Sequence, residues 1–139
     1  VTFVAILRAA LGFVDGLARD IPDPRFGHLG FYRDEETLKP IAYYNKLASD
    51  VEQTDVVLAD PMLATGGTMV ASLRALAERG CHENVTIASL LAAPEGIEVV
   101  RKEFPEVPIY LAALDRQLNN KGYILPGLGD AGDRQYGTF

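Results

Sequence analysis

Short apolar runs alternate with segments of helical periodicity along most of this chain. Residues 2–7 are apolar and partly β-branched, as in a buried strand, whereas residues 10–20 place apolar side chains near helical spacing. The same patterns predict further strands and helices. The predicted strands are 56–60, 85–92 and 108–114, and the predicted helices are 67–79 and 94–104. This alternation predicts an α/β fold with a doubly wound, mostly parallel sheet, and we expect one domain over residues 1–139.

Residues 25–47 interrupt the alternation with two strand patterns that flank a charged stretch. Residues 25–32 and 41–47 predict the two strands of a hairpin, and residues 33–40 predict its polar tip. We therefore expect a β-arm over about residues 32–47. Exposed segments of this kind often close over a binding site.

The chain from residue 119 onward is rich in glycine and lacks apolar periodicity. Five glycines between Gly122 and Thr138 argue against a packed helix and predict an irregular loop, whose backbone groups are free to contact a ligand. The adjacent Asp133 and Arg134 are interpreted as a local salt bridge.

Composition narrows the class of protein. Hydrophobic residues make up 48% of the chain and charged residues 23%, as in ordinary globular proteins. No apolar run approaches the roughly 20 residues that cross a bilayer, no secretion signal is expected, and Cys81 is the only cysteine. A cytoplasmic location without a membrane partner is expected.

The net charge of −6 argues against nucleic acid as a partner. Because the chain starts inside a strand pattern at Val1, without Met, we expect that an upstream segment is missing.

The most informative motif is VVLADPMLATGGT, residues 56–68. Its apolar strand ends in Asp60, and a loop containing Gly66 and Gly67 leads into a predicted helix. In open α/β sheets this edge binds ligands, and helix N-termini bind anions. A carboxylate suits sugar hydroxyls, so the motif predicts a site for a phosphorylated sugar. The alternative is an ordinary strand–helix turn with a capping threonine. The motif is not a Walker loop, since no lysine follows the glycines, and it does not match GxGxxG either.

VVLADPMLATGGT resembles the phosphoribosyl pyrophosphate (PRPP) motif of type I phosphoribosyltransferases. Its Asp-Pro pair, in place of two adjacent acids, resembles the uracil phosphoribosyltransferase branch. Other blocks agree in order over nearly the whole chain: Ile6-Leu7-Arg8-Ala9, Tyr32-Arg33, Glu35-Glu36-Thr37-Leu38, Ala92-Ala93-Pro94-Glu95-Gly96-Ile97 and residues 122–133. One departure is Ala10, where the family usually has glycine; if that position requires a positive φ, alanine adds strain.

The resemblance implies the roles of individual residues. The implied catalytic residues are Asp60, Arg8 and Arg33. The implied PRPP-binding residues are Arg8, Arg33, Asp60, Pro61, Met62, Leu63, Ala64, Thr65, Gly66, Gly67, Thr68 and Asp130. The implied uracil-binding residues are Ile124, Gly129, Asp130 and Ala131. A guanidinium is permanently charged and can grip phosphate with two donors, which suits the two arginines.

The implied reaction converts uracil and PRPP into UMP and pyrophosphate, in pyrimidine salvage. Mg²⁺ is expected to arrive with PRPP, and no protein-held metal site is predicted, because neither His28 nor His82 has partners at metal-ligand spacing. The family also implies a homodimer or larger homo-oligomer, with GTP as an effector. Two alternatives stay open. One is a regulator of this fold that binds nucleic acid, and the other is an enzyme of this fold that acts on another base, such as a purine.

Overall fold

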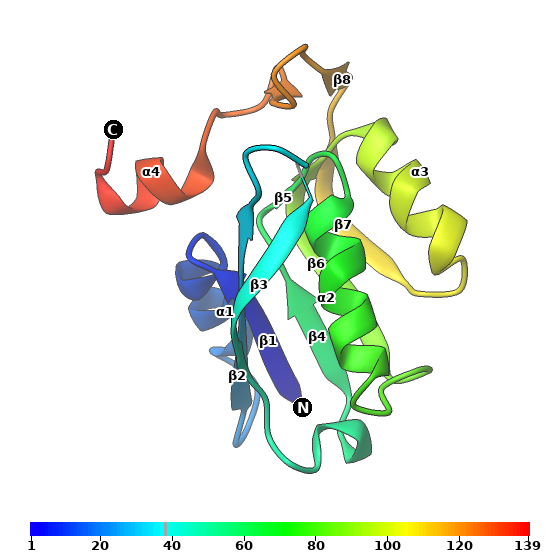
Figure 1. Cartoon of the computed structure of the whole chain (residues 1–139). Helices are drawn as coiled ribbons and strands as arrows, with labels where there is room; N and C mark the ends of the chain where they lie inside the picture. Colours follow the sequence, from blue (N-terminus) through cyan, green and yellow to red (C-terminus); the bar gives the residue numbers. More distant parts are fainter. Residues whose placement is uncertain (38) are drawn as a thin grey trace.

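The computed structural model describes residues 1–37 and 39–139, and its centre is a seven-stranded sheet (Figure 1). The strands are β1 (Thr2–Leu7), β2 (Arg25–Arg33), β3 (Pro40–Lys46), β4 (Val56–Ala59), β5 (Met62–Leu63), β6 (Val85–Ala92) and β7 (Ile109–Leu114). The order is β3-β2-β1-β4-β6-β5, and β7 also pairs with β6. All pairs are parallel except β2 with β3, which confirms the mostly parallel sheet. Leu38, in one of the blocks that resemble the family, lies outside the described residues.

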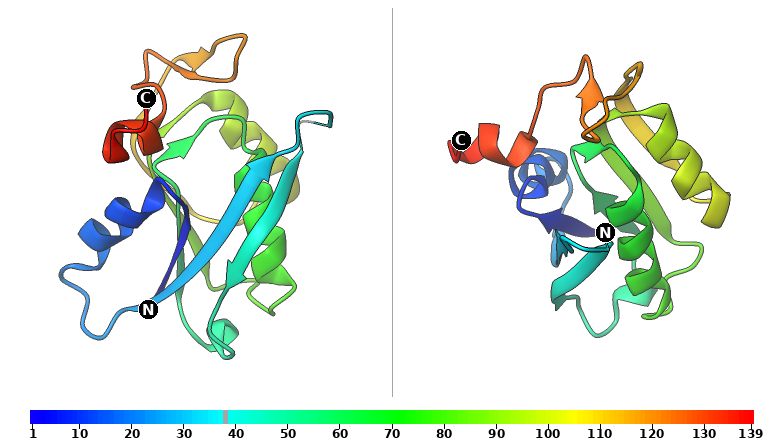
Figure 2. Two further views of the ribbon diagram at one scale, coloured as in Figure 1. Left: turned by 60° about the vertical axis from the view of Figure 1, so that its left-hand side comes forward. Right: turned by 45° about the horizontal axis from the view of Figure 1, so that its top comes forward.

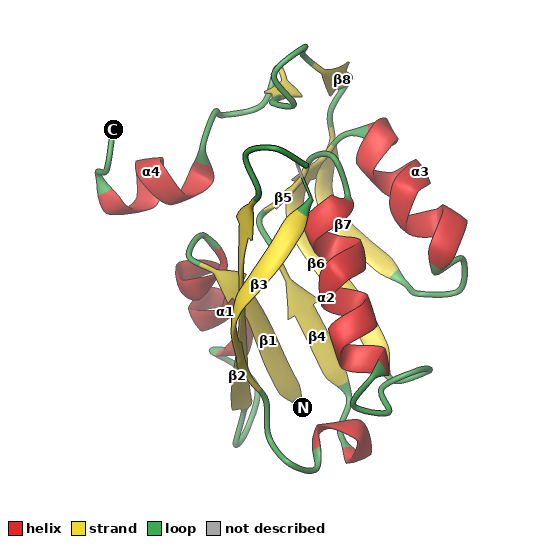
Figure 3. Cartoon of the chain, viewed as in Figure 1, coloured by secondary structure: helices red, strands yellow, loops and turns green. Residues whose placement is uncertain are grey.

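Helices cover both faces of this sheet. They are α1 (Ala10–Ala18), α2 (Gly67–Ala77), α3 (Pro94–Glu103) and the short α4 (Ala131–Tyr136), with a 3-10 turn at Val51–Gln53. Figure 2 shows α1 and α2 on opposite sides of the sheet, and Figure 3 shows the loops that connect them to the strands. None of these helices is long and apolar enough to cross a membrane.

Two hydrophobic clusters form because successive strand side chains point to opposite faces. On one face Phe3 and Ala5 of β1 pack with Ala10 and Val14 of α1. The other face buries a larger cluster, which includes Val4, Ile6 and Leu58 from the strands with Met69, Leu73 and Leu76 from α2. The doubly wound arrangement is thereby confirmed.

Ala10 is the first residue of α1 and is fully buried. Among the described non-glycine residues only Asp23 has a positive φ, so the φ of Ala10 is negative. Ala10 therefore does not need the conformation that favours glycine. The condition under which alanine would add strain at this position is therefore not met.

The predicted hairpin is present, and it extends past the neighbouring strand. Strands β2 and β3 pair antiparallel up to Arg33 and Pro40, with an irregularity between Gly30 and Phe31. Since the last residue of β1 pairs with Gly30, the final residues of β2 reach beyond the end of β1. In the turn, the Asp34 carboxylate accepts a hydrogen bond from the Thr37 backbone N–H at 2.7 Å, which lowers the pKa of Asp34.

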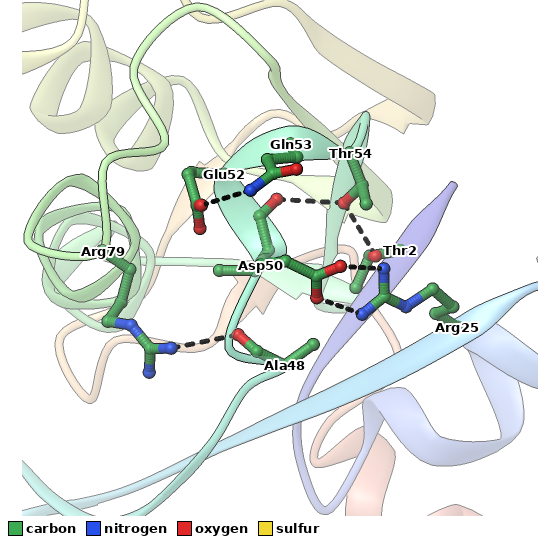
Figure 4. Close-up of polar contacts among 9 residues, drawn as sticks. Thr2, Arg25, Ala48, Asp50, Glu52, Gln53, Thr54 and Arg79 are labelled. Carbon is green, nitrogen blue, oxygen red and sulfur yellow. Dashed lines mark hydrogen bonds and ion pairs between the residues drawn. The ribbon is translucent and has the colours of Figure 1, made fainter.

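A polar network connects residues at the amino ends of the parallel strands (Figure 4). Arg25 donates to both carboxylate oxygens of Asp50, at 3.2 and 2.5 Å, and Arg79 donates to the Ala48 carbonyl oxygen at 3.0 Å. Because Arg25 pairs with Thr2 at the start of β1, this network lies at the amino ends of the parallel strands. The carboxyl ends of the strands lie at the other end of the sheet.

The C-terminal segment departs from the irregular loop expected from its glycines. It contains a two-stranded antiparallel hairpin, β8 (Gln117–Leu118) with β9 (Ile124–Leu125), followed by helix α4. Asp130 caps this helix by accepting a hydrogen bond from the Asp133 backbone N–H at 2.8 Å, and Gly137 ends it in the left-handed conformation. The prediction that no helix packs here is therefore wrong for residues 131–136, because caps at both ends stabilise a single short helix.

Candidate functional site

Two of the candidate residues follow neighbouring strands at the point where the strand order reverses. Strand β1 pairs with β2 on one side and with β4 on the other. Arg8 follows β1, through a cis peptide bond with Leu7, and Asp60 follows β4. Open α/β sheets bind ligands in the crevice at such a switch point, outside the carboxyl ends of the strands.

Three adjacent cavities meet at Asp60, which borders all of them. The first, of about 230 Å³, extends to the C-terminal segment. The second, of about 270 Å³, extends to Arg8. The third, of about 120 Å³, extends along the loop before α2 to Arg33. A ligand with three chemically different parts could therefore place one part in each cavity with Asp60 at the junction.

The cavity at the C-terminal segment contains every residue predicted to bind uracil: Ile124, Gly129, Asp130 and Ala131. It is also bordered by Gly122 and Tyr123, which the sequence reasoning did not assign. Ile124 is buried, whereas Tyr123 is partly exposed. The β8–β9 hairpin therefore contributes a side of this cavity beyond the predicted residues.

The loop before α2 turns into the helix through a left-handed glycine. Gly66 has a φ of 83° and directly precedes Gly67, the first residue of α2. Thr65, Gly66 and Thr68 border the third cavity, so the first turn of the helix lies beside it. Unpaired N–H groups and the helix dipole favour an anion at this position.

Two predicted PRPP-binding residues lie outside the three cavities. Pro61 is buried, and its carbonyl oxygen accepts hydrogen bonds from the N–H groups of Leu90 and Leu91 in β6, at 3.1 and 3.0 Å. Gly67 borders a separate groove between β3, α2 and α3. The other ten predicted PRPP-binding residues each border at least one of the three cavities.

Asp60 is largely removed from solvent at the junction of the three cavities. Its Oδ1 atom accepts a hydrogen bond from the Met62 backbone N–H at 3.1 Å, and it has no ion pair with any residue that the structure describes. Burial raises the pKa of Asp60 from its usual 3.8 to about 6, and the hydrogen bond from Met62 offsets part of this effect. Asp60 therefore ionises near pH 6 and above that pH offers a charged acceptor for hydroxyl groups.

Glycines allow the loop before α2 to contact α3 closely. A Cβ atom at Gly96, in the first turn of α3, would lie 2.2 Å from the Ala64 carbonyl oxygen. A Cβ atom at Gly66 would lie 2.7 Å from the Gly96 carbonyl oxygen. The backbone of the loop therefore packs directly against the backbone at the start of α3.

Polar side chains with roles that the sequence did not predict join the C-terminal segment to the end of β7 and to the start of α3. The Asp115 carboxylate accepts a hydrogen bond from the Gly127 N–H at 2.9 Å. The Glu95 carboxylate accepts one from the Leu118 N–H at 3.0 Å, which lowers the pKa of Glu95. Both bonds join residues distant in sequence, so no local pattern could have identified them.

The interpretation of Asp133 and Arg134 as a local salt bridge is wrong. Within the described part of the chain, Asp133 forms an ion pair with Arg8, at 3.6 Å from Nη2 to Oδ1. The C-terminal helix therefore carries a carboxylate to Arg8, which borders the second cavity and lies 125 residues earlier in the chain.

The chain matches one protein family over almost its whole length. A family model described as uracil phosphoribosyltransferase matches residues 1–138. The chain is 59% identical over 138 residues to the uracil phosphoribosyltransferase of Brevibacillus brevis, which covers 99% of this chain and 66% of that protein. It is 56% identical over 135 residues to the one of Thermoanaerobacter pseudethanolicus, which covers 97% of this chain and 64% of that protein. The chain thus spans slightly less than two thirds of the length of these curated relatives.

Solved structures show the same fold. The AQ2163 protein of Aquifex aeolicus is 43% identical and superposes with a TM-score of 0.90, covering 99% of this chain and 65% of that chain. A purine phosphoribosyltransferase from Pyrococcus horikoshii superposes with a TM-score of 0.63 at 17% identity, covering 84% of this chain and 71% of that one. This second likeness concerns the fold alone, and it confirms the expected type I phosphoribosyltransferase fold.

Proposed function

The chain belongs to the uracil phosphoribosyltransferase family, and we propose that it transfers the phosphoribosyl group of PRPP to uracil, giving UMP and pyrophosphate in pyrimidine salvage. The observation that carries this proposal is the meeting of the three cavities at Asp60. PRPP carries its 5-phosphate and its pyrophosphate on one ribose, and the base attacks the same ribose as the pyrophosphate leaves. A junction of three cavities at one carboxylate matches that connectivity.

Each cavity has the chemistry for one part of the substrates. The segment from Ile124 to Ala131 would hold uracil, whose edge presents alternating donors and acceptors that backbone groups can match. Residues 64–68 would hold the 5-phosphate, at the N-terminus of α2. Arg8 would bind the pyrophosphate in the second cavity. Arg33 borders the third cavity, beside the 5-phosphate site, so it would reach the pyrophosphate only when the arm closes. Asp60 would accept hydrogen bonds from the ribose hydroxyls.

The reaction is a displacement at the anomeric carbon, so few covalent steps are required of side chains. Catalysis would come from holding the base and the ribose carbon in line, and from charge stabilisation of the departing pyrophosphate. Closure of the arm formed by β2 and β3 would exclude water, which otherwise hydrolyses PRPP.

The donor set of this site fits Mg²⁺ that arrives with PRPP. Across residues 1–37 and 39–139 no group of three or more His, Cys, Asp or Glu side chains could hold a metal ion, but Asp60 and Asp130 border one cavity. Mg²⁺ is commonly held by one or two carboxylates together with substrate phosphates. When bound, it would neutralise charge on the pyrophosphate. A homo-oligomeric assembly and a response to GTP stay predictions from the family resemblance.

A panel of bases supplied with PRPP and Mg²⁺ tests the proposed function. We expect nucleotide formation with uracil and little or none with hypoxanthine, guanine or adenine, measured by chromatography of the products. Formation of a purine nucleotide instead would transfer the proposal to another base. If no base reacted and the protein instead shifted RNA in a salt-dependent gel assay, the chain would be a regulator.

Replacing Arg8 by alanine is expected to raise the KM for PRPP roughly 10- to 100-fold, because the variant loses charged hydrogen bonds to the pyrophosphate. Steady-state kinetics at varied PRPP would measure this change. Arg19→Ala is the matched control, since Arg19 is an exposed arginine at the far end of α1. Equal KM values in the two variants would mean that the pyrophosphate binds elsewhere.

A further inference from the structure

Helix α4 lies beside the start of α1 in both views of Figure 2, and Arg8 contacts Asp133 of this helix and Thr138 just after it. The Arg8 Nη2 atom donates to the Thr138 hydroxyl at 3.3 Å and lies 3.6 Å from Oδ1 of Asp133. The Thr138 hydroxyl in turn donates to Oδ1 of Asp133 at 2.7 Å. The three side chains therefore form a closed set of contacts around one nitrogen of the guanidinium.

Tyr136 contacts the same arginine from a different direction. The Arg8 Cζ atom lies 5.5 Å from the centroid of the Tyr136 ring, within the range of a cation–π interaction. The Tyr136 hydroxyl donates to the Arg8 carbonyl oxygen at 3.4 Å. One short helix thus contacts the backbone, the flat face and one edge of Arg8.

The remaining nitrogens of the guanidinium have no protein partner among the described residues. Among the described residues Nε and Nη1 of Arg8 have no hydrogen-bond partner, and 53% of the side chain is exposed. Arg8 borders the cavity of about 270 Å³ together with Asp60 and Thr68. Two of the three guanidinium nitrogens, Nε and Nη1, therefore stay available to an anion while Nη2 is held by the protein.

We propose that Asp133, Tyr136 and Thr138 are positioning residues that orient the Arg8 guanidinium toward the pyrophosphate of PRPP. The proposal rests on the proposed function. An arginine side chain has considerable rotamer freedom, and ordering it costs binding free energy when the ligand arrives. Contacts that order the side chain beforehand reduce this cost, so they lower the KM for PRPP without touching the substrate.

A purely structural role for α4 would give a different result. Helix α4 directly follows Gly129 and Asp130 of the proposed uracil site, and Asp130 caps it. If these contacts only secured the C-terminal segment, their loss would loosen the uracil site, and the KM for uracil would rise. If they orient Arg8, the KM for PRPP rises and the KM for uracil stays constant.

Thr138→Val tests the proposal, because valine has nearly the shape of threonine but no hydroxyl. We expect the KM for PRPP to rise about fivefold, the typical effect of one lost hydrogen bond. Thr138→Ser restores the hydroxyl and should restore most of the affinity. Arg134→Gln is the matched control on the same helix, since Arg134 has no side-chain hydrogen bond or ion pair within residues 1–37 and 39–139. An unchanged KM for PRPP in Thr138→Val, or a rise in the KM for uracil alone, would overturn the proposal.

A double-mutant cycle supplies a second test. In a protein that already carries Arg8→Ala, Thr138→Val should have no further effect on PRPP, because it acts through Arg8. An additive effect would contradict positioning. Calorimetric titration with Mg²⁺ and pyrophosphate repeats the cycle without a base. If wild-type protein forms no UMP, the proposed function fails, whereas the pyrophosphate titration still decides whether these residues position Arg8 for an anion.

Discussion

Asp60→Asn is expected to lower turnover about 100-fold, because asparagine replaces a charged acceptor at the proposed ribose site with a neutral one. The fold should remain intact, since asparagine has almost the same shape and its side-chain oxygen can still accept the hydrogen bond from Met62. Single-turnover measurements with saturating PRPP would report the change in the chemical step. Asp55→Asn is the matched control, as Asp55 is an exposed aspartate at the other end of β4. Turnover of Asp60→Asn equal to that of Asp55→Asn would rule out the ribose assignment.

The same substitution is expected to stabilise the protein at pH 7. The pKa of Asp60 is about 6 in the folded chain, against 3.8 in its usual environment, so the folded state binds more protons than the unfolded state between these values. Its contribution to stability is therefore fully present below about pH 4 and is lost as the pH rises through 6. That loss amounts to about 3 kcal/mol.

Thermal unfolding between pH 4 and 8 would measure this effect. The free energy of unfolding of the wild-type protein should fall in that interval as Asp60 ionises, and that of the Asp60→Asn variant should not. The stability difference between the two proteins should therefore grow with pH. The wild-type kcat/KM for PRPP should fall below about pH 6, as Asp60 becomes neutral. A pH-independent stability difference would mean that Asp60 ionises at its usual pKa.

Gly96→Ala is expected to lower both the free energy of unfolding and the activity. The new Cβ would lie 2.2 Å from the Ala64 carbonyl oxygen and 3.0 Å from that of Leu63, so backbone must move to accommodate it. Overpacking of this kind costs about 1–3 kcal/mol. A loop displaced by about 1 Å at a catalytic site can lower the rate roughly 100-fold. Urea unfolding and kinetics with varied PRPP would measure the two effects.

Gly16→Ala is the matched control for Gly96→Ala. Gly16 is also a helical glycine, but a Cβ there would meet nothing within 4 Å. Alanine favours a helix over glycine by about 1 kcal/mol, so this variant should be slightly more stable and fully active. If Gly96→Ala were as stable and active as Gly16→Ala, the contact between the loop and α3 would not constrain the site.

The sequence predicted the central elements because their signals are local. The apolar runs at residues 2–7 and 85–92 coincide with β1 and β6, and the prolines after residue 21 follow the end of α1. The prediction missed α4, whose stability comes from the caps at Asp130 and Gly137 and not from apolar periodicity. It also missed the β8–β9 hairpin, because two-residue strands carry too little pattern to detect.

For the candidate site, the sequence by itself determined which residues follow each strand. The pattern placed Asp60 at the carboxyl edge of the sheet, and the family resemblance added Arg8, which follows the neighbouring strand at the same edge. Only the tertiary structure decided what surrounds them. The elevated pKa of Asp60 arises from burial, and the partners of Arg8 come from residues more than 120 positions away. Burial and long-range contacts depend on how the elements pack in space, which local sequence patterns do not encode.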